Sequence, residues 1–148
     1  MTSHTDAIDI VLNQWHTAAA RADFEAYFNL LSEDAIFIGT DPTEKWTIPE
    51  FKAYSKPHFD KGKAWSFIKL QREIYLGPNL EIAWFDELLQ TRMGICRGSG
   101  VLQKEQQVWK IKQYVLSITI PNNQVDDVQQ NKADFDKNLV TKLKKNSH

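Results

Sequence analysis

The chain has 148 residues, which suits one compact domain, and 42% of them are hydrophobic, enough for a core. Lysine and arginine number 18 against 19 aspartate and glutamate residues, so there is no basic field to attract nucleic acid, and we expect no such partner. The single cysteine excludes an intrachain disulfide. No apolar run is long enough to cross a membrane, and the first residues lack signal-peptide features, so we expect a cytoplasmic protein without membrane contacts.

The first sixty residues predict three helices. Residues 6–22 carry apolar side chains at spacings of three and four, the pattern of an amphipathic helix. Asp23 can cap a second, short helix, and a short strand at 35–38 follows it. A third helix begins near Thr47, because Thr47 and Glu50 have the spacing of a capping box.

From Ala64 onwards the apolar pattern changes to a period of two, which is typical of strands. Helices followed by a run of strands indicate an α+β domain with the helices packed on one face of the sheet. The four strands form an antiparallel meander and are expected at residues 65–76, 80–90, 96–103 and 108–120.

After residue 123 the composition becomes polar. Phe135, Leu139 and Leu143 are spaced by four, so a partial helix fits this segment. We therefore divide the chain into a domain of residues 1–123 and a polar C-terminal tail of residues 124–148 that includes a short helix.

The pairing of the first two long strands decides which side chains face inward. A turn at residues 77–79 that pairs Leu76 with Leu80 would place Arg72 beside Trp84 and diagonal to Asp86, on an apolar face. A one-residue slip would reverse every side chain. The same face is then expected to carry Arg97, Ser99, Trp109, Ile111, Gln113, Val115 and Ser117.

Charges on an apolar face must be paired or hydrated. One interpretation is a structural Arg72–Asp86 pair, with Arg72 stacked on Trp84. The other is a polar patch in a ligand cavity, where Arg72 or Arg97 holds an anion and Asp86 acts as a base or hydrogen-bond acceptor.

Three local motifs resemble the SnoaL-like division of the nuclear transport factor 2-like (NTF2-like) superfamily, over roughly residues 6–121. They are the aromatic–Gly–Thr–Asp turn at 37–41, Arg97 with the following Val-Leu at 101–102, and the last strand with Trp109. The resemblance implies an NTF2-like cone, in which N-terminal helices pack on a curved antiparallel sheet around a cavity, often in a homodimer. Members include ketosteroid isomerase, polyketide cyclases and dehydratases, so the fold does not select an activity.

The last strand departs from the resembled pattern. Gln113 and Val115 stand where many relatives have histidines, so a general base or metal ligand is missing there. His16 and His58 have no second ligand at a metal spacing. We therefore expect no metal and no cofactor.

Two functions stay open. The first is an uncharacterised SnoaL-like protein that binds a small, partly hydrophobic ligand in its cavity. The alternative is an isomerase, cyclase or dehydratase-type enzyme that uses a cavity carboxylate for proton transfer on a carbonyl-bearing substrate. The candidate catalytic residues are Asp41 and Asp86. The candidate ligand-binding residues are Trp15, Tyr27, Glu44, Trp46, Tyr54, Arg72, Trp84, Arg97, Ser99 and Gln113.

Two further expectations concern the surface. An exposed aromatic face of the first long strand, formed by Trp65, Phe67 and Tyr75, predicts a homodimer, because large apolar faces need cover. The carboxylate of Asp41 lies in a turn, and it either caps that turn or points across the cavity.

Overall fold

The computed structural model describes residues 3–147 and consists of two units, Met1–Ile118 and Thr119–His148. The first unit is an α+β domain, as the sequence predicts. Its helices are α1 (His4–Ala20), α2 (Phe24–Asn29), α3 (Ile48–Asp60) and the short η1 (Pro78–Leu80). Its strands are β1 (Leu31–Ile38), β2 (Lys45–Thr47), β3 (Ile68–Leu76), β4 (Ile82–Thr91), β5 (Gly94–Glu105) and β6 (Val108–Ile118).

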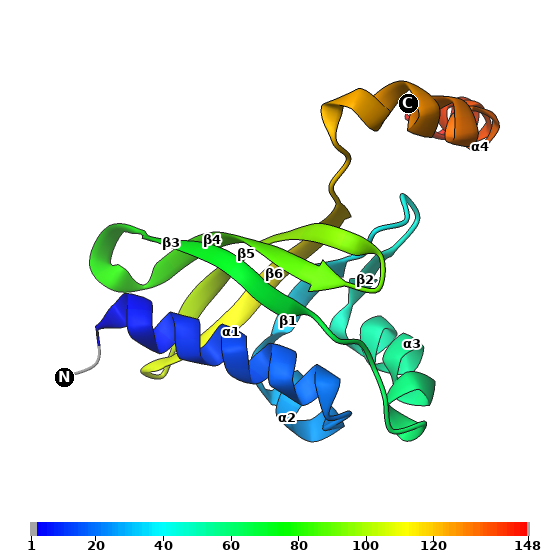
Figure 1. Cartoon of the computed structure of the whole chain (residues 1–148). Coiled ribbons are helices and arrows are strands. Elements are labelled where there is room, and N and C mark those ends of the chain that lie inside the picture. Colours follow the sequence, from blue (N-terminus) through cyan, green and yellow to red (C-terminus); the bar gives the residue numbers. More distant parts are fainter. Residues whose placement is uncertain (1–2, 148) are drawn as a thin grey trace. The chain divides into compact units, whose positions relative to one another are not determined.

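The six strands form one mixed sheet in the order β2-β1-β6-β5-β4-β3. Strands β3 to β6 are the predicted antiparallel meander, which is confirmed. The short strand β1 extends the sheet by pairing parallel to β6, and β2 pairs antiparallel to β1. Helix α1 lies along one face of this sheet, where it contacts β3 and β6, and α3 lies beside β1 and β2 (Figure 1).

Helices α2 and α3 begin where the sequence places their caps. The carboxylate of Asp23 accepts a hydrogen bond of 3.1 Å from the backbone N–H of Ala26, which starts α2. The predicted capping box at α3 is confirmed, since Glu50 Oε1 accepts the backbone N–H of Thr47 at 2.9 Å. These local hydrogen bonds fix where α2 and α3 start against the sheet.

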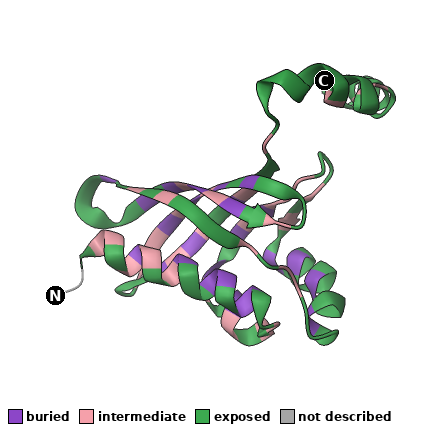
Figure 2. Ribbon diagram, viewed as in Figure 1, coloured by how far each residue is buried: buried purple, intermediate pink, exposed green. Residues whose placement is uncertain are grey.

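The core lies between the helices and the inner face of the sheet, where the buried residues gather (Figure 2). Trp15 of α1 is at its centre: it stacks on Tyr27 with ring centroids 5.0 Å apart and meets Tyr114 edge-on at 4.7 Å. Gly98 of β5 leaves the room that Tyr114 needs, because a Cβ atom there would lie only 2.0 Å from the Tyr114 hydroxyl oxygen. Large aromatic side chains therefore fill the part of the domain next to α1.

The predicted pairing of β3 with β4 is wrong. Leu76 pairs with Ala83 and not with Leu80, because η1 makes the connection longer than a three-residue turn. Two consecutive left-handed residues, Asn79 at φ 63° and Leu80 at φ 56°, reverse the chain within it. The shift of three residues is odd, so it moves the predicted inward residues Trp84 and Asp86 to the outer face.

A bulge in β6 divides the last strand. Val101 pairs with Gln113 but Leu102 pairs with Ile111, so Lys112 is the extra residue. Trp109 and Ile111 are buried as predicted, whereas Gln113, Val115 and Ser117 lie on the outer face. The expectation that all five share one face is therefore wrong.

The second unit holds a short 3₁₀ turn, η2 (Asn122–Gln124), and one long helix, α4 (Val125–Lys145). α4 has 21 residues and includes Phe135, Leu139 and Leu143. Acidic side chains stand in its first turn and lysines in its last, an order that favours the helix through its dipole.

Candidate functional site

A pocket of about 640 Å³ opens in the first unit and is the candidate site. Its walls come from the ends of β1 and β2, from α3, from the segment at 63–67 and from the β4–β5 hairpin. We call it the aromatic pocket, after six of its lining residues: Phe37, Trp46, Phe51, Tyr54, Trp65 and Phe67.

The rings of the aromatic pocket lie close to parallel. Trp46 stacks on Tyr54 with centroids 4.4 Å apart and an interplanar angle of 25°, and on Phe51 at 5.3 Å and 19°. Phe51 in turn lies 5.9 Å from Trp65 at 27°. Such a set of aligned flat rings suits a flat, apolar ligand.

Two basic side chains, one carboxylate and the imidazole of His58 line this pocket. Lys63 and Arg92 line it as cations, and within residues 3–147 neither is held by an ion pair. Glu44 is the carboxylate of the lining, and its Oε1 accepts the backbone N–H of Asp41 at 3.0 Å. The pocket therefore offers two cationic side chains and one anionic side chain that is tied to a turn.

Of the predicted site residues, Glu44, Trp46 and Tyr54 meet at this pocket. Burial and the charge of Glu44 raise the pKa of Tyr54, so its hydroxyl stays protonated at neutral pH and can donate a hydrogen bond. Trp15 and Tyr27 lie behind the lining, since Tyr27 contacts Trp65 edge-on at 5.6 Å.

The question about Asp41 is resolved by its contacts. Its Oδ1 accepts the hydroxyl of Thr43 at 2.6 Å and the backbone N–H of Thr43 at 2.9 Å. These hydrogen bonds lower the pKa of Asp41. The carboxylate caps its own turn and does not line the aromatic pocket.

A carboxylate is buried inside the domain at Glu87, a residue that the sequence did not single out. Its Oε2 accepts the Tyr114 hydroxyl at 2.6 Å and lies 2.8 Å from Nε2 of His16. Because an ionised carboxylate can only accept, His16 must donate its Nε2–H here. Arg72 donates Nε–H to Oε1 at 2.8 Å, and its Nη2 lies 2.7 Å from the same oxygen.

Arg72 links this buried carboxylate to α1 on its other side. Its Nη1 donates to Asp9 Oδ1 at 2.7 Å and to Asn13 Oδ1 at 2.8 Å. The predicted Arg72–Asp86 pair and the stacking of Arg72 on Trp84 are both wrong, because the odd register shift puts Glu87 inside instead. We call Glu87, His16, Arg72 and Tyr114 the Glu87 network.

The Glu87 network holds its carboxylate in the ionised form. Burial alone would raise the pKa of Glu87, but the hydrogen bond and charge of His16, the charge of Arg72 and the Tyr114 hydroxyl outweigh it and lower the pKa to about 2. A carboxylate with that pKa is a poor base near neutral pH. The side chains that surround it also occupy the space that a substrate would need.

The remaining predicted site residues lie on the outer face of the sheet. Asp86 accepts the hydroxyl of Tyr75 at 2.9 Å, and Trp84 stacks on Tyr75 at 6.1 Å and 21°. Arg97, Ser99 and Gln113 share that face, as their pairing with the neighbouring strands shows. Their expected position inside the domain is wrong, and their binding roles stay predictions.

The sequence reasoning missed both Glu87 and Arg92. Glu87 follows Asp86 directly in an apolar strand, so only the register distinguishes the two acids. Arg92 lies between β4 and β5, and the sequence of such a turn predicts only a solvated cation. The clustering of aromatic residues between 46 and 67 was the available signal for this part of the pocket.

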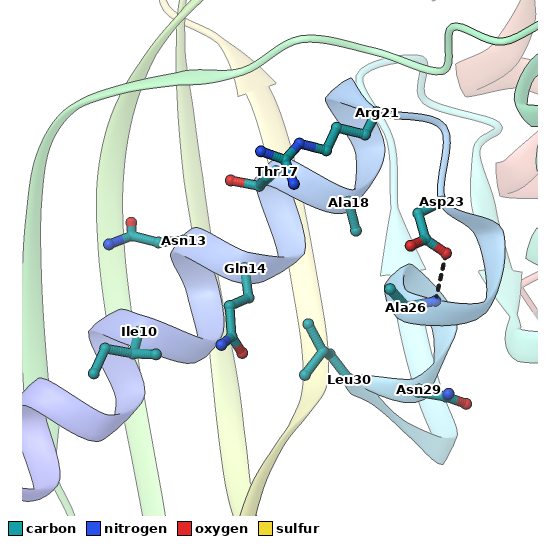
Figure 3. Close-up of a pocket in the computed structure, with 10 residues that line it drawn as sticks. All are labelled: Ile10, Asn13, Gln14, Thr17, Ala18, Arg21, Asp23, Ala26, Asn29 and Leu30. Atoms are coloured by element: carbon teal, nitrogen blue, oxygen red, sulfur yellow. Dashed lines mark hydrogen bonds between the residues drawn. The ribbon is translucent and has the colours of Figure 1, made fainter.

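A second hollow of about 580 Å³ lies on the outside of α1 and α2 (Figure 3). Gln14 and Leu30 lie between the two helices, but Asn13 accepts a hydrogen bond from Arg72 and Asp23 caps α2. This hollow has no aromatic lining residue, so the aromatic pocket is the better candidate for an apolar ligand.

Residues 3–147 contain no group of three or more His, Cys, Asp or Glu side chains placed to hold a metal ion. Nor does this part of the chain contain a helix that is long and apolar enough to cross a membrane.

Comparisons with known proteins agree with this geometry. A model of the SnoaL-like domain matches residues 8–121. No curated protein matches the chain. The structure is similar to an NTF2-like protein from Cytophaga hutchinsonii, with 18% identity, a TM-score of 0.67 and coverage of 79% of this chain and 99% of that one.

Two further solved structures are similar. One is an NTF2-like protein of unknown function from Pseudomonas putida, with 10% identity, a TM-score of 0.65 and coverage of 82% and 92% of the two chains. The other is an NTF2-like protein of unknown function from Shewanella oneidensis, with 20% identity, a TM-score of 0.60 and coverage of 76% and 98%. At these identities the likeness shows the fold, and the expected cone of helices on a sheet is confirmed.

Replacing Glu87 by Gln tests the Glu87 network. The pKa of Glu87 rises from about 2 in the folded protein to about 4.5 on unfolding, so its contribution to stability is complete above about pH 4.5 and is lost as the pH falls through 2. Denaturant unfolding of the wild type should therefore lose on the order of 3 kcal/mol between pH 4.5 and 2 that E87Q does not lose. At pH 7 we expect E87Q to be about 3–5 kcal/mol less stable, because the buried guanidinium of Arg72 loses the carboxylate with which it pairs.

Asp86→Asn is the matched control for E87Q, since Asp86 is the adjacent acid on the outer face. It should change stability at pH 7 by less than about 1 kcal/mol. Equal stabilities of E87Q and the wild type at pH 7, or parallel stability curves between pH 2 and 5, would contradict the role given to Glu87.

Proposed function

The chain belongs to the SnoaL-like domain family, and on this premise we propose that it binds a small, flat, partly hydrophobic ligand with an anionic group in the aromatic pocket. The observation that carries the proposal is the meeting of aligned rings and two cationic side chains in one hollow of about 640 Å³.

The apolar part of the ligand follows from the rings. Trp46 and Tyr54 stack on each other and keep exposed surface at the pocket, whereas Phe51 behind Trp46 is buried. A planar group that leaves water can therefore pack against these two rings. A bulky saturated compound would cover less of these surfaces. An aromatic or conjugated ring system is therefore the ligand class that fits best.

The anionic part follows from Lys63 and Arg92. Both line the pocket, and Arg92 can hold a carboxylate with two parallel hydrogen bonds. The opposing charge of Glu44 is already engaged with the backbone of the turn at 41–44. An aromatic carboxylate combines both requirements.

Binding is favoured over catalysis because the interior carboxylate is committed elsewhere. Glu87 accepts from three side chains and is completely buried, so it cannot take a proton from a bound ligand. Phe67, which lines the pocket, packs edge-on against His16 at 5.8 Å and separates the two regions.

A second candidate function is proton transfer on a carbonyl compound. One observation favours it: Glu44 and the protonated hydroxyl of Tyr54 line the same pocket. The carboxylate could take a proton from the carbon next to the carbonyl, while the phenol donates a hydrogen bond to the carbonyl oxygen. In this alternative Glu44 takes the role that the sequence suggested for Asp41 or Asp86.

The proposal also includes a homodimer, although its basis differs from the one first expected. Trp65 and Phe67 are half-buried and line the pocket, so they do not form an exposed face. Tyr75 remains exposed, at 40% of its surface, next to Trp84. Apolar surface that could join two copies is therefore found elsewhere, on the outer sheet face and on α4.

The binding proposal is tested with 2-naphthoate and its uncharged analogue 2-naphthalenemethanol, by titration calorimetry. The wild type should bind the acid more tightly than the alcohol. Trp46→Ala should weaken both about tenfold, because a stacking wall is lost, whereas Arg92→Gln should weaken only the acid, also about tenfold.

Trp84→Ala is the matched control, since it removes an indole from the outer face and should leave both affinities unchanged. The proposal fails if neither compound binds, or if Trp84→Ala weakens binding as much as Trp46→Ala.

The alternative is tested by hydrogen–deuterium exchange at the methyl group of 2-acetonaphthone in D₂O, followed by proton NMR. Proton transfer through Glu44 predicts exchange that the wild type accelerates and Glu44→Gln abolishes. The glutamine keeps the oxygen that accepts from Asp41, so the turn should survive the substitution. If both proteins leave the exchange rate at its value in buffer, proton transfer on such ketones is excluded.

Light scattering at micromolar concentration tests the homodimer. We expect twice the chain mass of 17.1 kDa. A mass of one chain over the whole concentration range would remove the homodimer from the proposal.

A further inference from the structure

α4 carries a stripe of apolar side chains along its length. Spacings that keep to the helical repeat place them on one side of the helix, and no residue of α4 is buried. Phe135 exposes 49% of its surface and Leu143 56%. Among the described residues of its unit, α4 is accompanied only by η2 and short connections, so nothing there covers the stripe. Its members are Val125, Val128, Phe135, Leu139 and Leu143.

A lone helix with such a stripe needs a partner. Most of the stability of a protein helix comes from packing of its apolar face, and within its own unit that face of α4 is uncovered over about 31 Å. The polar residues around the stripe mark α4 as an interaction helix and not as a part of a core.

The charges of α4 point to a second copy of the same helix. Its first half carries Asp126, Asp127 and Asp134, and its second half carries Lys137 and the lysines at 142, 144 and 145. Two parallel copies would place acidic next to acidic and basic next to basic. Two antiparallel copies place each acidic half beside a basic half, which is the favoured arrangement.

Lys132 and Asp136 supply the most specific part of the pattern. Lys132 projects from the middle of the apolar stripe, and Asp136 follows one turn later, 3.0 Å away within the same helix. In an antiparallel pair centred on residue 134, each Lys132 faces Asp136 of the other copy. In a parallel pair Lys132 would meet Lys132 on the stripe, at an electrostatic cost.

We propose that two copies of this chain pair through α4 in antiparallel orientation, centred on residue 134. In this register Val125 faces Leu143, and Val128 packs against Leu139, which is one residue from the position directly opposite, so apolar side chains meet along the stripe. Lys132 of each copy pairs with Asp136 of the other, and these two symmetric ion pairs fix the orientation and register of the helices. The inference rests on the homodimer part of the proposed function and names the surface that forms it.

A charge swap tests the pairing. Lys132→Asp puts two acids opposite each other in a homodimer, and Asp136→Lys puts two lysines opposite each other. Each variant alone should dimerise at least about tenfold more weakly than the wild type in sedimentation equilibrium. An equimolar mixture should recover the wild-type affinity, because the acid introduced in one variant then faces the lysine introduced in the other.

The mixture separates pairing between copies from an effect within one helix. If the substitutions acted only by breaking the Lys132–Asp136 contact inside α4, mixing would rescue nothing. A dimer that both single variants retain at wild-type affinity would place the interface elsewhere, on the outer sheet face for example, and would overturn the inference while leaving the homodimer intact. A wild-type monomer would overturn both.

Disulfide trapping gives a second readout of orientation. Mixed Val128→Cys and Leu139→Cys chains should form a cross-linked dimer under mild oxidation, whereas Val128→Cys alone should not. Mixed Gln130→Cys and Lys137→Cys chains are the matched control. In the antiparallel pair these two positions have the same offset along the helix axis as 128 and 139, but they lie outside the stripe. Efficient self-cross-linking of Val128→Cys would show parallel pairing, and no cross-link in the first mixture would show that the stripes do not meet; either result contradicts the proposal.

Discussion

The buried carboxylate of Glu87 is the constraint on which the domain depends. It lies completely inside, where an unpaired charge is costly, and it is satisfied only because α1, β3 and β6 each bring a donor to it. His16 fixes α1, Arg72 fixes β3 and Tyr114 fixes β6, so their positions cannot vary independently. Gly98 belongs to the same arrangement, because any side chain there would collide with the Tyr114 hydroxyl. This network orients α1 across the sheet more specifically than apolar packing alone.

The same constraint determines where open space remains in the domain. With Trp15, Tyr27 and the Glu87 network filling the region under α1, open space remains at the other side of the core, between α3 and the β4–β5 hairpin. The turn at 41–44 and the capped start of α3 hold Trp46 and Tyr54 at this opening. The charges of the Glu87 network are buried and paired with one another. Arg92 and Lys63 line the pocket and are not part of that network.

Local signals in the sequence predicted the helices and the meander, because caps and apolar periodicity act over a few residues. Asp23 and the Thr47–Glu50 box mark helix starts that the structure confirms. The face of the sheet on which each strand residue lies could not be predicted from such local signals. The register depends on a loop in which Asn79 and Leu80 adopt left-handed backbone angles, although neither is a glycine that would have indicated them. In addition, Asp86 and Glu87 are adjacent acids in a strand that is apolar on both faces, so only the register shows which one is buried. The sequence therefore predicted only part of the pocket, namely Glu44, Trp46 and Tyr54. Trp65 and Phe67 were expected on an exposed face, and Glu87 and Arg92 could be placed only with the strand register and the β4–β5 hairpin.

The proposed binding site is the aromatic pocket, and not the interior of the domain or the outer face of the sheet. The indole N–H signals of the five tryptophans report on it directly, because each lies in a different place. During a titration of the ¹⁵N-labelled protein with 2-naphthoate, the account predicts that the signals of Trp46 and Trp65 shift while those of Trp15, Trp84 and Trp109 stay in place. Shifts confined to Trp84, or no shift of Trp46 at saturating naphthoate, would contradict it.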